Sequence, residues 1–324
     1  APLHLAAISG HVAAARSLLA AGADATIRFG NDSVSAMDCA ACNGRVRVIR
    51  AMIEHGVDAN STGPTGITAL HQAAMNGQAG VVGLLLEAGA GKDALDSEMR
   101  TPLHRAAIKG HLAATEALLA ADADATLCYG KDNSTAMDWA AYKGRVRVLR
   151  AFILHGADVN ASACTGRTAL HKAARNNQTS AVNLLLEAGA NINPPRVRRS
   201  TALHFALASG SSQATLSLLN RGAIVDLRDK NGHTPLHAGS MRAGKYGLAD
   251  CVDLMLRWGA DEAAVDKNGA TAADLIGRRL GGDDLMPEEF ERARKLLVSA
   301  PADKAWRRRG LLVLCRAHPD RLRL

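Results

Sequence analysis

Short apolar segments rich in alanine and leucine recur along the chain, and polar turns containing glycine separate them. Leucine runs such as Leu18-Leu19 and Leu84-Leu85-Leu86 are each followed, three residues after the last leucine, by a glycine. Glycine adopts the left-handed conformation that ends a helix at little cost. The pattern therefore predicts short helices in pairs, and one pair is too thin to bury its apolar face without neighbouring pairs.

A four-residue frame marks the beginning of each pair. Its fullest form is Thr101-Pro102-Leu103-His104, in which Thr101 can accept a backbone N–H at the helix start and Pro102 needs no donor. Successive frames are 33 or 34 residues apart, with 37 before the last. The frames begin near residues 1, 35, 68, 101, 135, 168, 201, 234 and 271.

The frame, the Ala-Ala that follows its histidine, and Leu-Leu-Leu-Glu-Ala-Gly-Ala at 84–90 and 184–190 resemble the ankyrin repeat family. The resemblance implies an all-α fold, an ankyrin-repeat solenoid of stacked helix-turn-helix pairs with hairpin-like fingers, over residues 1–300. It also implies a non-catalytic scaffold that binds other proteins on a concave face lined by first helices and fingers. Residues 301–324 are expected to form a basic helical tail that caps the last repeat.

Composition agrees with thin stacked helices, because 48% of the residues are hydrophobic but only 3% are aromatic. Six cysteines are scattered without a framework spacing, which indicates free thiols and an intracellular protein, cytoplasmic or nuclear. No apolar stretch approaches the ~20 residues of a membrane helix. We therefore expect no membrane insertion.

A longer period lies above the repeat, because 55 of the first 90 residues are identical to the residue 100 positions later. Repeats 1–3 and 4–6 are thus two copies of one block. By the resemblance, the variable first-helix positions are the residue after the frame histidine and those three and four further on. At these positions neutral residues of the first copy become cations in the second: Leu5 becomes Arg105, Ser9 becomes Lys109, Asn43 becomes Lys143, Gln72 becomes Lys172 and Met75 becomes Arg175.

Scarce aromatic residues occupy the same positions, where Cys39 becomes Trp139 and Cys42 becomes Tyr142, and the next repeat adds Phe205. Aromatic and basic residues are enriched at binding hot spots, so these positions are candidate partner contacts. The alternative is a solvated helix face with no partner. A basic groove favours an acidic or phosphorylated segment. The presumed finger turns add four further candidates: Phe29, Tyr129, Arg196 and Arg198.

Motifs for catalysis or cofactors are weak. Gly239 to Tyr246 nearly matches a phosphate-binding loop, but Tyr246 cannot supply the hydroxyl for Mg²⁺. Cys39 and Cys42 provide half of a metal site at most. We therefore expect no enzyme activity, no cofactor, no metal and no nucleic-acid partner, and we expect a monomer.

The tail leaves a second function open. It holds seven Lys/Arg against two Asp/Glu, and Leu311 to Arg316 resembles the start of a SOCS-type box, the elongin-docking helix of some ubiquitin-ligase adaptors. Pro319 departs from the aliphatic residue of that pattern, and Gly310 also differs from it. A substrate-recruiting adaptor is thus the alternative to a plain scaffold.

Overall fold

The computed structural model describes residues 1–29, 33–129, 133–162, 166–193, 200–242, 247–276 and 288–300. The chain divides into two compact units. Unit 1 holds residues 1–140 and 145–158, and unit 2 holds residues 141–144 and everything from Val159 onwards. Arg196, Arg198, the turn at 243–246 and the tail from 301 lie outside the described residues.

Unit 1 consists of helix pairs with two small β-hairpins between them. Its elements are α1 (Pro2–Ser9), α2 (Val12–Ala20), β1 (Arg28–Phe29), β2 (Val34–Ser35), α3 (Ala36–Cys42), α4 (Val46–Glu54), α5 (Ala69–Met75), α6 (Ala79–Glu87), α7 (Pro102–Lys109), α8 (Leu112–Ala120), β3 (Cys128–Tyr129), β4 (Ser134–Thr135), α9 (Ala136–Tyr142) and α10 (Val146–Leu154). Unit 1 contains α9 only as far as Ala140.

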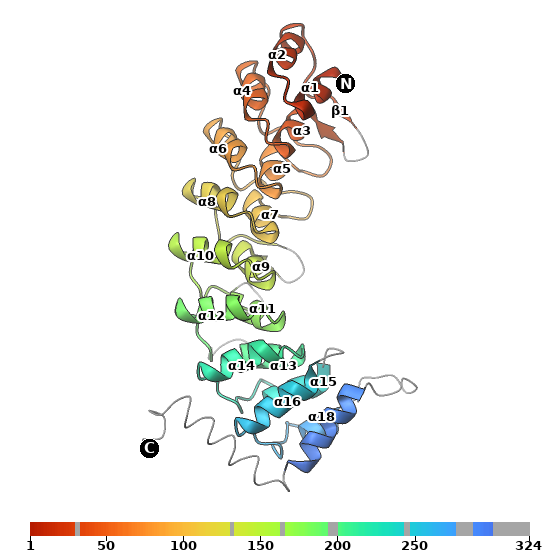
Figure 1. Cartoon of the computed structure of the whole chain (residues 1–324), viewed down its shortest axis with the longest axis vertical. Coiled ribbons are helices and arrows are strands. Elements are labelled where there is room, and N and C mark those ends of the chain that lie inside the picture. Colours follow the sequence, from red (N-terminus) through yellow and green to blue (C-terminus); the bar gives the residue numbers. More distant parts are fainter. Residues whose placement is uncertain are drawn as a thin grey trace. The chain divides into compact units, whose positions relative to one another are not determined.

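The first helices of unit 1 form one row and the second helices another, as Figure 1 shows for α1, α3, α5 and α7 beside α2, α4, α6 and α8. Alanine makes the close approach of the first helices possible, because Ala40, Ala41, Ala73 and Ala74 are completely buried. The predicted stacking of helix pairs is confirmed in this unit.

Helix starts follow the frame as predicted. The Thr101 hydroxyl accepts a hydrogen bond from the backbone N–H of His104. In turn, the backbone N–H of Thr101 donates to Nδ1 of His104 at 3.3 Å. Thr68 and His71 repeat this arrangement. Gly110 ends α7 with a φ of 89°, a conformation that disfavours any side chain.

Several frame histidines also connect neighbouring repeats. His71 Nε2 donates to the carbonyl oxygen of Arg100 at 3.0 Å, in the finger of the following repeat. His4 makes the equivalent contact with Val34 at 3.2 Å. The buried His71 ring therefore satisfies one polar atom of its own helix cap and one of the next finger. Nδ1 of His4, whose helix begins without a capping hydroxyl, has no such partner among the described residues.

Unit 2 continues the same helix pairs. Its elements are α11 (Ala169–Arg175), α12 (Thr179–Glu187), α13 (Ala202–Ala208), α14 (Ser212–Asn220), α15 (Pro235–Arg242), α16 (Leu248–Arg257), α17 (Ala272–Leu275) and α18 (Glu288–Ser299). Thr271 caps α17 through Asp274, as the frame predicts.

The two hairpins of unit 1 have the same register, as expected for copies of one block. Arg28 pairs with Ser35 and Phe29 with Val34 in the first hairpin. Cys128 pairs with Thr135 and Tyr129 with Ser134 in the second. Each hairpin runs directly into a first helix, α3 or α9, so its aromatic residue lies beside the frame histidine of the preceding first helix.

Candidate protein-binding surface

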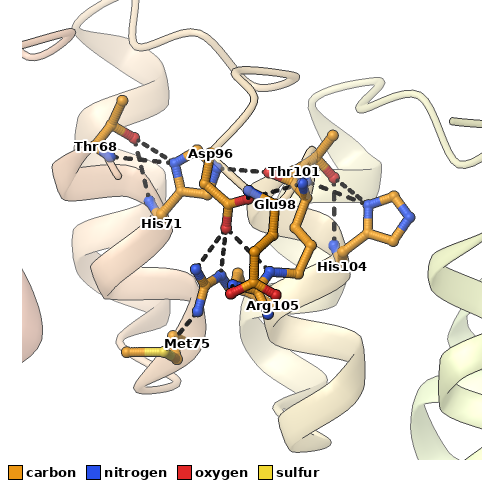
Figure 2. Close-up of polar contacts among 9 residues, drawn as sticks. Thr68, His71, Met75, Asp96, Glu98, Thr101, His104 and Arg105 are labelled. Atoms are coloured by element: carbon orange, nitrogen blue, oxygen red, sulfur yellow. Dashed lines mark hydrogen bonds and ion pairs between the residues drawn. The ribbon is translucent and has the colours of Figure 1, made fainter. Parts of the chain in front are cut away.

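Arg105 lies on α7 of unit 1 at the position after the frame histidine, and the finger before α7 holds its side chain (Figure 2). Its Nε donates to Oδ2 of Asp96 at 2.9 Å, and its Nη2 donates to the same oxygen. Only 14% of the Arg105 side chain is exposed. The predicted candidate is thus a fixed guanidinium rather than a freely moving one.

Asp96 is the centre of this arrangement. Its Oδ1 accepts the backbone N–H groups of Glu98 and Arg100, and its Oδ2 also accepts Nε of Arg100 at 3.1 Å. Burial alone would raise the pKa of Asp96, but the backbone N–H of Arg100 and the two guanidinium groups outweigh it and lower that pKa. The carboxylate therefore stays charged and keeps both arginines in place.

One N–H of Arg105 has a poor acceptor. Nη1 points to the thioether sulfur of Met75 at 3.5 Å, as Figure 2 shows. Thioethers are weak acceptors, whereas carboxylate and phosphate oxygens match the fork of a guanidinium. Arg100, by contrast, also pairs with the carboxylate of Glu98. Arg105 is therefore the arginine of this pair with capacity for a further anion.

Lys109 lies four residues after Arg105 in α7, which places both cations on one face of the helix. It is exposed, and none of the residues that the structure describes pairs with its ammonium group. The position in the last turn suits a cation because the helix dipole is negative there. Arg105 and Lys109 together make a small positively charged surface on the first-helix row of unit 1.

Aromatic rings continue this surface at the second hairpin. Tyr129 packs edge-on against His104, with centroids 4.8 Å apart, and stacks on Trp139 at 5.7 Å. Arg100 lies over the Tyr129 ring at 5.9 Å. Tyr129 is buried, which differs from the expectation of an exposed finger residue, while Trp139 is half-buried. Burial lowers the pKa of His104 to about 4.

The first hairpin is arranged differently although its backbone is the same. Phe29 packs edge-on against His4 at 5.1 Å, yet 49% of Phe29 is exposed. Nη1 of the neighbouring Arg28 donates to the carboxylate of Asp38 at 3.1 Å and to the carbonyl oxygen of Ser33 at 2.9 Å. Phe29 is thus the aromatic candidate of unit 1 that is exposed at the surface.

Unit 2 carries the remaining candidates. The Lys143 ammonium lies over the Tyr142 ring at 5.5 Å, and both residues are at least partly exposed. Arg175 is exposed at the end of α11, whereas Lys172 is buried, which differs from the expected exposure. Phe205 packs against His171 at 5.3 Å, and the guanidinium of Arg167 covers its ring at 5.2 Å.

Sequence reasoning missed Asp96, Arg100 and Arg167, because all three lie in fingers outside the variable helix positions. A signal was present: Asp96 and Arg100 are four residues apart, and Asp229 and His233 repeat that spacing with 3.5 Å between them. In the described ranges, no group of three or more metal-binding side chains occurs. The described helices also include none that is long and apolar enough to span a membrane.

Comparison with known proteins agrees with these features. Family models for ankyrin repeats in three copies match residues 1–63, 37–127 and 121–196, and the single ankyrin repeat matches residues 231–267. The crystal structure of the human ASB11 ankyrin repeat domain is similar over 69% of this chain and 99% of that domain, with 29% identity and a TM-score of 0.61. No curated protein matches the chain. The chain belongs to the ankyrin repeat family, whose members are generally non-catalytic modules that bind other proteins.

Proposed function

We propose that unit 1 binds an acidic or phosphorylated segment of another protein through Arg105, Lys109 and Trp139. The observation that carries this proposal is the Arg105 guanidinium, which Asp96 fixes in place and whose Nη1 has only a thioether as acceptor. A fixed guanidinium loses little side-chain entropy when an anion binds. Lys109 supplies a second positive charge one turn away, and Trp139 supplies a partly exposed aromatic surface.

Unit 2 supports the same function through its own residues. Arg175 and Lys143 are exposed cations, and Phe205 and Tyr142 add aromatic surface. Among them, Phe205 is fixed between His171 and Arg167, which favours a rigid contact over a mobile one. The two units therefore supply the same chemistry, a cation beside an aromatic ring.

The test is binding of the full chain to immobilised degenerate peptides with one fixed phosphoserine or, in a parallel set, one fixed serine. We expect Lys109→Glu to weaken retention of the phosphoserine peptides about tenfold by charge repulsion. Arg105→Lys keeps the charge but removes the fork, and we expect a similar loss with unchanged helix content.

The matched control is Arg150→Glu on α10, because Arg150 is also exposed and the change in charge is the same. Its binding should stay within about twofold of the wild type. Equal losses for Lys109→Glu and Arg150→Glu would show general electrostatic attraction, and the proposal would then be abandoned.

A second function rests on the sequence of the tail, where Leu311 to Arg316 resembles part of a SOCS-type box. The structure does not describe these residues. If the protein is a substrate-recruiting adaptor of a ubiquitin ligase, purified elongin B–elongin C should bind the full chain and not a chain ending at Ala300. Equal binding, or none by the full chain, removes this alternative.

A further inference from the structure

The two hairpins of unit 1 present their aromatic rings in the same way. Phe29 and Tyr129 occupy equivalent registers, opposite Val34 and Ser134. Each ring packs edge-on against a frame histidine, with interplanar angles of 67° for His4 and 89° for His104. Each hairpin is followed directly by a first helix, α3 or α9, which can supply a second neighbour for the ring.

Only the second hairpin has that neighbour among the described residues. Trp139 on α9 stacks on Tyr129 with an interplanar angle of 17°, and Tyr129 is 7% exposed. The equivalent residue on α3 is Cys39, whose side chain is much smaller than an indole. Phe29 is correspondingly 49% exposed. At this position the first copy thus lacks the aromatic side chain that the second copy contains.

We propose that an aromatic side chain of a partner protein stacks on Phe29, in the place that Trp139 takes on Tyr129. The second copy shows the occupied form of the same site, which is why the occupant is assigned as an aromatic ring. This proposal rests on the proposed protein-binding function, but it uses residues separate from Arg105 and Lys109.

The surroundings of Phe29 suit an apolar ligand. Leu5 follows His4, the residue against which Phe29 packs, and it is 68% exposed with a neutral aliphatic side chain where the second copy has Arg105. Cys39 contributes a neutral thiol, since burial raises its pKa. Arg28 is held by Asp38 and by the Ser61 hydroxyl, at 3.1 and 3.3 Å, so its charge is already paired. An aromatic residue with an aliphatic neighbour fits these contacts.

The decisive variant is Cys39→Trp, which copies the second hairpin into the first. The internal tryptophan should cover Phe29, raise the melting temperature and compete with any external ring. The probes are immobilised degenerate peptides with one fixed tryptophan and matched peptides with one fixed leucine. We expect the wild type to retain the tryptophan peptides preferentially and Cys39→Trp to lose that preference by about tenfold.

The converse variant is Trp139→Cys, which uncovers Tyr129 and should add a second site for the tryptophan peptides. Unchanged preference in a folded Cys39→Trp variant would overturn the proposal. A wild type that dimerises in sedimentation while Cys39→Trp is monomeric would also overturn it, because a second copy would then cover Phe29. Lys109→Glu separates the two proposals, since it should weaken phosphoserine binding and leave tryptophan binding intact.

Discussion

The first and second copies of the three-repeat block place different side chains on one backbone. The hairpin of the first copy is held by an ion pair, Arg28 with Asp38, and leaves its ring exposed. The hairpin of the second copy has Cys128 in place of Arg28 and is covered by Trp139 instead. Both copies keep the frame and most of the helix-ending glycines, and Asp122 and Asn177 take the left-handed conformation where the first copy has Gly22 and Gly77. The covering of each finger, by contrast, is decided by one or two residues.

The largest expected effect concerns protonation of His104 in the covered copy. Its pKa is about 4 in the folded protein against an ordinary 6.5, so the unfolded chain binds the proton first as the pH falls. The stability contributed by the neutral ring is fully present above pH 6.5 and is lost progressively between pH 6.5 and 4. The loss amounts to about 3 kcal/mol for this ring.

Urea unfolding at pH 7.5 and pH 4.5 measures this effect. Burial lowers the pKa of His71 and His171 as well. The free energy of unfolding of the wild type should therefore fall by more than the contribution of His104 alone. His104→Gln should be less stable at pH 7.5 but should lose less on acidification. An identical loss in both proteins would show that His104 does not titrate on unfolding.

Trp139→Cys gives the second copy the residue that the first copy has at this position, Cys39. It should destabilise the folded protein by about 2 kcal/mol, because Tyr129 loses its stacking partner and a half-buried indole disappears. Water should also reach His104, and its pKa should rise towards 6.5. Chemical denaturation gives the stability, and NMR titration of the histidine ring gives the pKa. A pKa that stays near 4 would show that Tyr129 alone buries His104.

Arg28→Ala tests the ion pair of the uncovered copy. Asp38 is only 3% exposed, so removing its cation should cost about 1 to 3 kcal/mol. The matched change in the second copy, Cys128→Ala, should cost about 0.5 kcal/mol or less. Thermal unfolding of both variants is the measurement, and equal costs would mean that the two hairpins are held in the same way.

The smallest effect is expected on the second-helix row. Arg16 and Glu54 form an ion pair of 2.7 Å in the first copy, and both side chains are about half exposed. The second copy has Glu116 and Leu154 at these positions, and Leu154 is 78% exposed. Glu54→Leu should therefore change stability by about 0.5 kcal/mol or less. A larger loss would show that the exposed pair matters to the fold.

Sequence was sufficient for the elements because their signals are local. Thr101 begins α7 and Gly110 ends it, and these roles depend only on neighbouring backbone groups. The repeat period then places the helices beside one another, since each pair buries its apolar face against the next.

The state of the site residues was not predictable in the same way, because it depends on contacts across fingers. Arg105 lies at a variable helix position, as expected, but its partner Asp96 comes from the preceding finger. Tyr129 was expected at a finger turn and is buried by Trp139, ten residues further along the chain. Charge reversal at Arg105 would place two carboxylates together, so Lys109 is the better position for testing binding.

The contact between His71 and the carbonyl of Arg100 has a consequence for motion. It connects the start of α5 to the finger that leads into α7, so the two elements are expected to open together rather than singly. Amide hydrogens in this pair of repeats should exchange with solvent at related rates. Replacing His71 by leucine would separate those rates, turning one cooperative segment of unit 1 into two that open independently.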